Sequence, residues 1–165
     1  MATTVNTCVP VDWTFADMLR HLGGIPSERI RMYPPPGTAT EKDVLEARAR
    51  TGRICELVDG VLVEKTVGYY ESKLALMLAH LLHDFLEVHD LGEVSGPDGP
   101  MEILAHQVRI PDVAFLRWES FPGGKSPREP IPAVAPDLAV EVLSKGNTEA
   151  EMTRKLDEYF RAGVR

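Results

Sequence analysis

A run of seven residues near the C-terminal end constrains the fold most. Residues 137–143 spell DLAVEVL, and their apolar side chains are nearly continuous. A continuous apolar run of this length is typical of a strand buried on both of its faces. The sequence therefore predicts a sheet at the centre of the domain, with this strand inside it.

A second β signal lies in the first half of the chain. Two β-rich runs, 54–58 and 61–64, flank the dipeptide Asp59-Gly60. Asp-Gly is favoured by the type I′ turn, whose twist matches that of paired strands. We predict a β-hairpin here, and a further strand over 109–116.

Helices are predicted between and around these strands. Thr40 is a plausible N-cap, with Asp43 placed to favour the helix dipole. Leu74, Leu78, Leu81, Leu82 and Phe85 form one apolar stripe at helical spacing. The predicted helices span 12–22, 40–50, 71–88 and the segment from Thr148 to Gly163. The order of elements describes an α/β (mixed α+β) domain with one central mixed sheet flanked by helices.

Composition bounds the function. The 165 residues suggest one domain. Eighteen Lys and Arg against 25 Asp and Glu give 18 − 25 = −7, which counts against a simple DNA-binding module. It counts less against a nuclease, because such an enzyme gathers carboxylates around a cation.

Cys8 and Cys55 match no metal or disulfide spacing. With no signal peptide and no membrane span in the sequence, we expect a cytoplasmic protein.

Two carboxylates stand where apolar side chains are expected. Asp112 follows Pro111 at the start of one apolar strand, and Glu141 lies inside another. A carboxylate in a buried strand costs several kcal/mol unless it is paired or bound to a cation. Glu141 alone is equally compatible with an arginine partner or a sheet edge that faces water. Two such acids on neighbouring strands favour a metal site, since Mg²⁺ takes a few hard oxygen ligands.

Two further residues are candidates from their place on helices. In the last helix Met152, Leu156, Tyr159 and Phe160 form the predicted inward stripe. Lys155 lies at the edge of that stripe, so it can reach the sheet and stabilise negative charge on a phosphate. Its alternative is a stem that packs while the amine reaches water. Glu71 lies in the first turn of its helix, where it either favours the helix dipole or supplies another metal ligand.

Several ordered segments together resemble a known family. They are Glu56-Leu57-Val58-Asp59-Gly60, Arg109-Ile110-Pro111-Asp112-Val113-Ala114 and residues 136–144, followed by Lys155 and by residues 159–164. This set is similar to the family described as "Uma-type putative restriction endonuclease", which belongs to the PD-(D/E)XK superfamily. The resemblance divides the chain into residues 1–35, a tail and short helix, and a nuclease-like domain over 36–165.

The resemblance implies a restriction-endonuclease-like fold and a site that hydrolyses DNA phosphodiester bonds. By this likeness Asp112 and Glu141 would bind Mg²⁺, or Mn²⁺ in its place, together with the backbone carbonyl of Val142 and Glu71. The position two residues after Glu141, where the superfamily has a lysine, holds Leu143. The likeness therefore assigns that role to Lys155 on the following helix, with Lys145 as its rival.

Family members continue beyond the Ala162-Gly163-Val164 segment into a further strand. The likeness thus implies a sheet that lacks its last strand, with an edge that invites pairing with a second copy of the chain. Two functions follow. The first is a metal-dependent endodeoxyribonuclease. The alternative is a catalytically degenerate nuclease fold that acts as a binding or dimerisation module.

Overall fold

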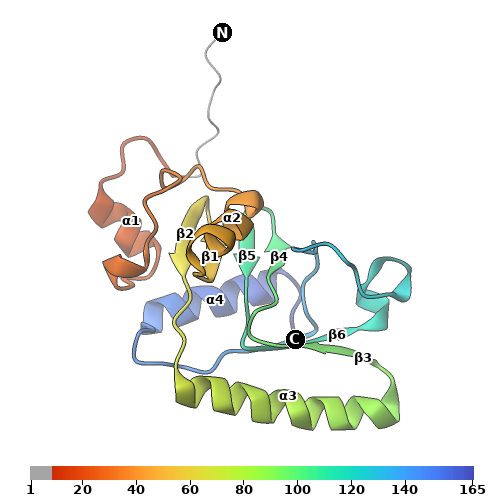
Figure 1. The fold of residues 1–165 in the computed structure, drawn as a ribbon. Helices are drawn as coiled ribbons and strands as arrows, with labels where there is room; N and C mark the ends of the chain where they lie inside the picture. Colours follow the sequence, from red (N-terminus) through yellow and green to blue (C-terminus); the bar gives the residue numbers. More distant parts are fainter. Residues whose placement is uncertain (1–8) are drawn as a thin grey trace.

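The computed structural model describes residues 9–165 (Figure 1). Most of the predicted N-terminal tail, including Cys8, lies outside the described residues. The helices are α1 (Phe15–His21), α2 (Glu41–Thr51), α3 (Tyr69–His89) and α4 (Glu149–Arg161). The strands are β1 (Cys55–Val58), β2 (Val61–Glu64), β3 (Gly92–Ser95), β4 (Met101–Leu104), β5 (Gln107–Arg109), β6 (Val113–Arg117) and β7 (Leu138–Val140).

The strands form two antiparallel sheets. The first has the order β2-β1-β5-β4 and the second the order β3-β6-β7. This confirms the mixed α+β class, but the expected single sheet is divided in two. The predicted strand 109–116 breaks at Ile110-Pro111-Asp112 because Pro111 has no N–H to give to a ladder. The chain leaves the first sheet there and enters the second.

The predicted hairpin is confirmed. Val58 pairs with Val61 across the turn, and Asp59 and Gly60 have φ values of 46° and 73°. Both values are positive, as a type I′ turn requires. The hairpin fixes the alternation of β1, which sends Leu57 to one face of the sheet and Glu56 to the other.

Each face of the first sheet has its own apolar cover. On one face Val44 of α2 packs with Cys55, Leu57 and Val108. Near the hairpin, Met18 and Leu22 from α1 and the turn after it pack with Val58, Val61 and Val63. Because side chains alternate along a strand, Glu56 and Arg109 point away from α2. They face α4, which lies behind the first sheet in Figure 1.

The caps of the helices explain where they begin. Thr40 and Asp43 form a capping box at α2, as predicted. Thr14 and Asp17 form another, so α1 begins at Phe15 rather than at residue 12. The Thr148 hydroxyl caps α4 by accepting from the Glu151 backbone N–H.

Helix α3 covers the predicted stripe only in part. It lies along the second sheet (Figure 1), and its buried residues are Ala75 and Leu86. Within the stripe, Leu74 and Leu82 are half-buried, whereas Leu81 is 64% exposed and Phe85 52% exposed. The helix ends at His89, with Asp90 as its C-cap, one residue beyond the predicted range.

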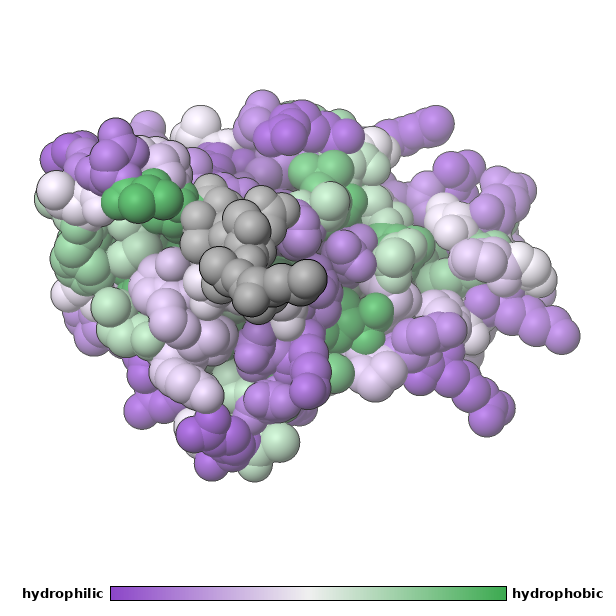
Figure 2. Space-filling model, turned by 90° about the horizontal axis from the view of Figure 1, so that it is seen from above, coloured by the Kyte–Doolittle hydropathy of each residue, from purple (hydrophilic) through white to green (hydrophobic). Residues whose placement is uncertain are grey.

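The side of the molecule opposite α3 is mainly hydrophilic. Figure 2 shows the face that carries the N-terminal part of the chain, where hydrophilic side chains predominate and hydrophobic ones are scattered.

None of the helices described between residues 9 and 165 is long and apolar enough to cross a membrane.

Candidate functional site

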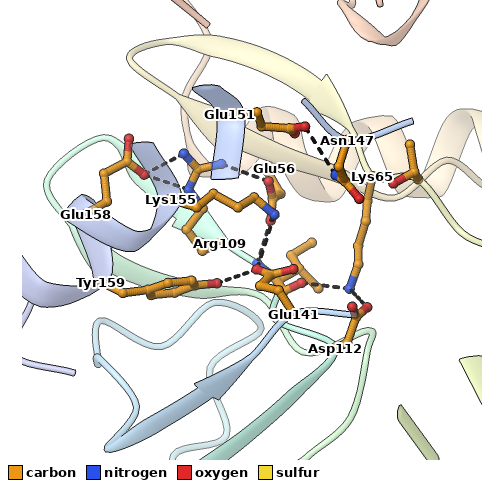
Figure 3. A network of polar contacts seen from close by, with 12 residues as sticks. Glu56, Lys65, Arg109, Asp112, Glu141, Asn147, Glu151, Lys155, Glu158 and Tyr159 are labelled. Atoms are coloured by element: carbon orange, nitrogen blue, oxygen red, sulfur yellow. Dashed lines mark hydrogen bonds and ion pairs between the residues drawn. The ribbon is translucent and has the colours of Figure 1, made fainter. Parts of the chain in front are cut away.

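The candidate site lies where the chain passes from one sheet to the other. Only Ile110, Pro111 and Asp112 separate β5 of the first sheet from β6 of the second. Helix α4 supplies Lys155, Glu158 and Tyr159 to the same region (Figure 3). The junction therefore gathers side chains from both sheets and from one helix.

Asp112 and Glu141 lie at the same end of the paired strands β6 and β7. The register pairs Val113 with Val140, and the Asp112 backbone N–H donates to the Val140 carbonyl at 2.9 Å. Asp112 and Glu141 each stand one residue beyond this pair. Lys65, which contacts Asp112, is also near enough to lower the pKa of Glu141. The two acids singled out from the sequence thus lie in the same part of the network (Figure 3).

Each of the two carboxylates has its own partners. Asp112 Oδ1 lies 2.8 Å from Lys65 Nζ, and its Oδ2 accepts from the Val142 backbone N–H at 2.7 Å. Glu141 Oε1 accepts from Lys155 Nζ at 3.2 Å and from the Tyr159 hydroxyl at 2.7 Å. The orientation of both acids is therefore fixed by groups from several segments.

Lys155 does reach back to the sheet. Its Nζ lies 3.0 Å from Glu56 Oε1 and 3.2 Å from Glu141 Oε1, and only 4% of the residue is exposed. Burial lowers the pKa of Lys155, but the charges of Glu56 and Glu141 outweigh it and leave this pKa above its usual value. The ammonium group remains charged between two carboxylates.

The buried face of α4 is charged rather than apolar. Glu151, Lys155, Glu158 and Tyr159 are its buried residues, at the i, i+4, i+7, i+8 spacing of one helix face. Leu156 and Phe160, predicted to point inward, are 54% and 60% exposed. That part of the predicted stripe is wrong, because α4 packs on a surface that offers charged partners.

Sequence reasoning missed several members of the site. Arg109 donates to Glu56 at 2.8 Å and to Glu158 at 2.8 Å. The register that pairs Leu57 with Val108 places Glu56 opposite Arg109, which explains their contact. Both residues stand inside β-rich runs, as Glu141 does. The criterion that selected Glu141 could therefore have selected them.

A second buried pair lies beside this network. Arg29 binds the Glu151 carboxylate through two nitrogens, at 3.0 and 2.7 Å. Its Nε also donates to the Glu64 carbonyl at 2.9 Å. This pair ties α4 to the N-terminal part of the chain and holds the helix that carries Lys155.

The contacts of the site form a chain of alternating charges. From one end, each member contacts the next: Asp59, Arg154, Glu158, Arg109, Glu56, Lys155 and Glu141. At the other end Lys65 contacts Asp112. The charge of Lys65 also acts to lower the pKa of Glu141. Asp112 and Glu141 are therefore two acids gathered at one end of the network, each with a lysine as its partner.

The same end is the more exposed part of the inner network. The side chains of Asp112 and Glu141 are 13% and 15% exposed, against 1% for Glu56. Burial raises the pKa of Glu56, but Lys155 and Arg109 outweigh it and bring the pKa to about 2. For Glu141, burial and the nearby Glu56 prevail over Lys155, and its pKa is raised. The neighbouring positive charges thus outweigh the effect of burial at Glu56 but not at Glu141.

Glu71 and Lys145 occupy different surroundings. Glu71 lies in the first turn of α3, and its carboxylate is folded back over Gly68, where a Cβ would lie 2.1 Å from Oε2. Within residues 9–165 no hydrogen bond or ion pair joins Glu71 to the network. Lys145 is exposed in the loop before α4. The structure therefore brings Asp112, Glu141 and Lys155 together without these two residues.

The donor set suits a small hard cation. No group of three or more histidine, cysteine or acidic side chains placed to hold a metal ion is found among the described residues. Two carboxylates are nevertheless what Mg²⁺ commonly takes from a protein, because it keeps several of its waters. Asp112 and Glu141 fit that requirement.

Comparisons with known proteins bear on the fold and on the family. The chain is similar to a crystal structure described as a "putative nuclease belonging to DUF820" from Anabaena variabilis ATCC 29413. The TM-score is 0.59 at 14% identity, and the match covers 69% of this chain and 64% of that one. This likeness supports the restriction-endonuclease-like fold. The chain thus spans less than two thirds of that structure's length. A search of curated proteins found no match.

The family comparison covers most of the chain. The family described as "Uma2: Putative restriction endonuclease" matches residues 41–165, which include every member of the charged network apart from Arg29. The region that carries the site is thus the region that carries the family likeness. This chain belongs to the Uma2 family of nuclease-like proteins.

Proposed function

We propose that this protein is a Mg²⁺-dependent endonuclease that hydrolyses DNA phosphodiester bonds, with Mn²⁺ as a working substitute. The observation that supports the proposal best is the gathering of two carboxylates, Asp112 and Glu141, beside the buried Lys155 where the two sheets meet. A divalent cation would take these hard oxygens as ligands. It also gives an acidic chain, of net charge −7, a local positive field for a phosphate.

The residues of the site have separate roles in the proposed reaction. A bound Mg²⁺ supplies a water of lowered pKa and stabilises charge on the phosphate. Asp112 and Glu141 would hold the ion, with the Val142 carbonyl as a further ligand. Val142 N–H and Tyr159 keep the two carboxylates in fixed orientations. These contacts exist before substrate binds, so little reorganisation is needed during the reaction.

Lys155 is the residue we assign to the reacting phosphate. Its ammonium is charged, buried and held between Glu56 and Glu141. A fixed positive charge at the edge of the metal site stabilises the negative charge that develops as water attacks phosphorus. Lys145, its rival by sequence position, is exposed and has no such support.

Nicking of supercoiled plasmid tests this assignment. We expect nicking by the wild type with Mg²⁺ or Mn²⁺ and none with a chelator. Asp112→Asn, Glu141→Gln and Lys155→Met should each reduce the rate by roughly 100-fold or more, as loss of a group that stabilises a transition state does. Lys145→Met is the matched control and should nick at the wild-type rate.

The result that opposes the proposal is equally specific. A wild type that nicks at the same rate as Asp112→Asn and Glu141→Gln has its activity elsewhere or from a contaminant. A rate that falls in Lys145→Met but not in Lys155→Met assigns the lysine role to the loop instead.

A second candidate function is self-association through α3. Leu74, Leu78, Leu81, Phe85 and Val88 recur at alternating intervals of four and three, which is the seam pattern of paired helices. Leu81 is 64%, Phe85 52% and Val88 79% exposed. An exposed apolar seam of this regularity favours a helix from another chain as its partner.

Charge on one flank of the seam favours a second copy of this chain. Lys73 lies beside the first half of the seam, and Asp84 and Glu87 beside the second. When two α3 helices meet antiparallel about Leu81, the basic half of each flank meets the acidic half of the other. A two-fold contact is self-complementary in this sense.

Sedimentation analysis separates this candidate from a monomer. The wild type should sediment as a dimer at micromolar concentration and Leu81→Glu as a monomer. Leu156→Glu places the same charge at an exposed leucine of α4 and should leave the dimer intact. A wild type that is monomeric at all concentrations excludes the α3 dimer.

A further inference from the structure

Lys65 is a buried lysine that the proposed reaction does not use. It follows β2, and its side chain is 5% exposed. Its Nζ lies 2.7 Å from the Ile110 carbonyl, 3.1 Å from the Pro97 carbonyl and 2.8 Å from Asp112 Oδ1. An ammonium group has three N–H donors, so these three oxygens use all of them.

This saturation determines what Lys65 can do. With no donor free, Lys65 does not contact a substrate without losing a bond to the protein. Two of its bonds go to backbone carbonyls, from the loop after β3 and from the link between β5 and β6. Its charge therefore stays in place even when Asp112 binds another cation. Lys65 is a fixed positive charge beside a carboxylate that the metal needs.

We propose that Lys65 is a positioning residue that orients Asp112 and, as a built-in counter-cation, lowers the affinity of the site for a divalent ion. The inference rests on the proposed function, because it assumes that Asp112 is a metal ligand. Together with the Val142 N–H, Lys65 occupies both oxygens of Asp112 from defined directions. A metal ion at Asp112 then shares the carboxylate with a charge of the same sign, which repels it through a low-dielectric interior.

The consequence is opposite to that of an ordinary structural lysine. Removal of a residue that only supports the fold leaves metal affinity unchanged or weaker. Removal of a competing cation makes metal binding tighter. The sign of the change in dissociation constant therefore distinguishes the two roles.

Titration of Mn²⁺ alone, by calorimetry, tests the proposal without any need for activity. Lys65→Met keeps the length of the side chain and removes its charge. We expect its dissociation constant for Mn²⁺ to be at least tenfold lower than that of the wild type. Lys145→Met removes the charge of an exposed lysine and serves as the control, with an unchanged constant.

A second variant protects the test against loss of folding. Lys65→Met leaves two buried carbonyls without their donor, which is destabilising. Lys65→Gln is also neutral but retains N–H donors for these acceptors. Circular dichroism identifies which variants fold, and tighter Mn²⁺ binding is expected in each folded one.

The outcomes separate this inference from the proposed function. If the wild type binds Mn²⁺ and the folded Lys65 variants bind it equally or more weakly, the role of Lys65 is overturned and the metal site stands. If only the Lys65 variants bind Mn²⁺, the competition is stronger than stated and the inference holds. If no variant binds at millimolar Mn²⁺, the metal site itself is overturned, and the role of Lys65 falls with it.

Discussion

Helices α3 and α4 each depart from the usual pattern of buried apolar and exposed charged side chains. Helix α4 buries charges, and helix α3 exposes apolar residues. Helix α4 buries Glu151, Lys155 and Glu158, and exposes Leu156 and Phe160. Helix α3 leaves most of an apolar seam exposed, including Leu81 and Phe85. Folded proteins rarely bury charges unless these are paired, and rarely expose ordered apolar rows. The first exception lies at the proposed site of chemistry, and the second at the proposed surface for a partner.

The difference lies in what each helix packs against. Helix α4 faces strands that carry Glu56 and Arg109, so its charges find partners within hydrogen-bond distance. Helix α3 touches the second sheet through a narrower face that includes Ala75 and Leu86. Amphipathic spacing alone therefore tells which residues share a side of a helix, but not which side is covered.

The largest effect should come from removing the arginine under α4. Arg109→Met takes one of two cationic partners from each of the buried carboxylates Glu56 and Glu158, leaving Lys155 and Arg154 as the others, and should cost about 3 kcal/mol. Urea denaturation should show this loss in the free energy of unfolding. Arg161→Met removes an exposed arginine of the same helix system and should change it by less than about 0.5 kcal/mol. An equal loss of unfolding free energy in the two variants would contradict a difference between the buried and the exposed arginine.

Acid should weaken the α4 interface at a defined pH. The pKa of Glu56 is about 2 in the folded protein, against an ordinary glutamate value of 4.5. A carboxyl with a lowered folded pKa stabilises the protein above its unfolded pKa, and this contribution is lost as pH falls. Stability should therefore decrease between about pH 4.5 and pH 2, and Glu56→Gln should flatten that decrease. The midpoint of urea unfolding against pH measures both curves, and parallel curves contradict the assignment.

Glu141 should behave in the opposite sense. Its folded pKa is raised, so its contribution to stability is present at low pH and is lost as pH rises through that raised value. At neutral pH without metal, Glu141→Gln should stabilise the protein, whereas Glu56→Gln should destabilise it. The thermal midpoints of the two variants test this contrast, and a shift of the same sign in both would break it.

The smallest effect belongs to the outer face of α4. Leu156 is 54% exposed, so Leu156→Ser should change the free energy of unfolding by less than about 0.5 kcal/mol. It should also leave the oligomeric state unchanged, whereas Leu81→Ser on α3 should weaken the dimer. If the Leu156→Ser variant is a monomer, the interface lies on α4 and not on α3.

Much of the local structure could be predicted from the sequence. The Asp59-Gly60 hairpin and the Thr40 cap depend on neighbouring residues only, and both are confirmed. The place of Asp112 and Glu141 in one network could be anticipated because a buried strand does not carry an acid without reason. The break at Pro111 was missed, since one proline is compatible with a strand end as well as with a change of sheet.

The partners of those acids could not be predicted in the same way. Lys65 contacts Asp112 from a residue 47 positions earlier in the chain, a separation given by 112 − 65. Arg109 and Glu158 are joined across 49 positions. Such pairs depend on how the two sheets and α4 are arranged in space. A pattern within one segment contains no information on that arrangement.

The central claim is that a cation belongs between Asp112 and Glu141. Electron paramagnetic resonance of Mn²⁺ titrated into metal-free protein tests it most directly, because the signal of free Mn²⁺ is lost on binding. The account predicts Mn²⁺ binding by the wild type that is lost in Asp112→Asn and in Glu141→Gln, and retained when the exposed Glu149 is changed to Gln. Binding that all four proteins share, or that none of them shows at millimolar Mn²⁺, contradicts it.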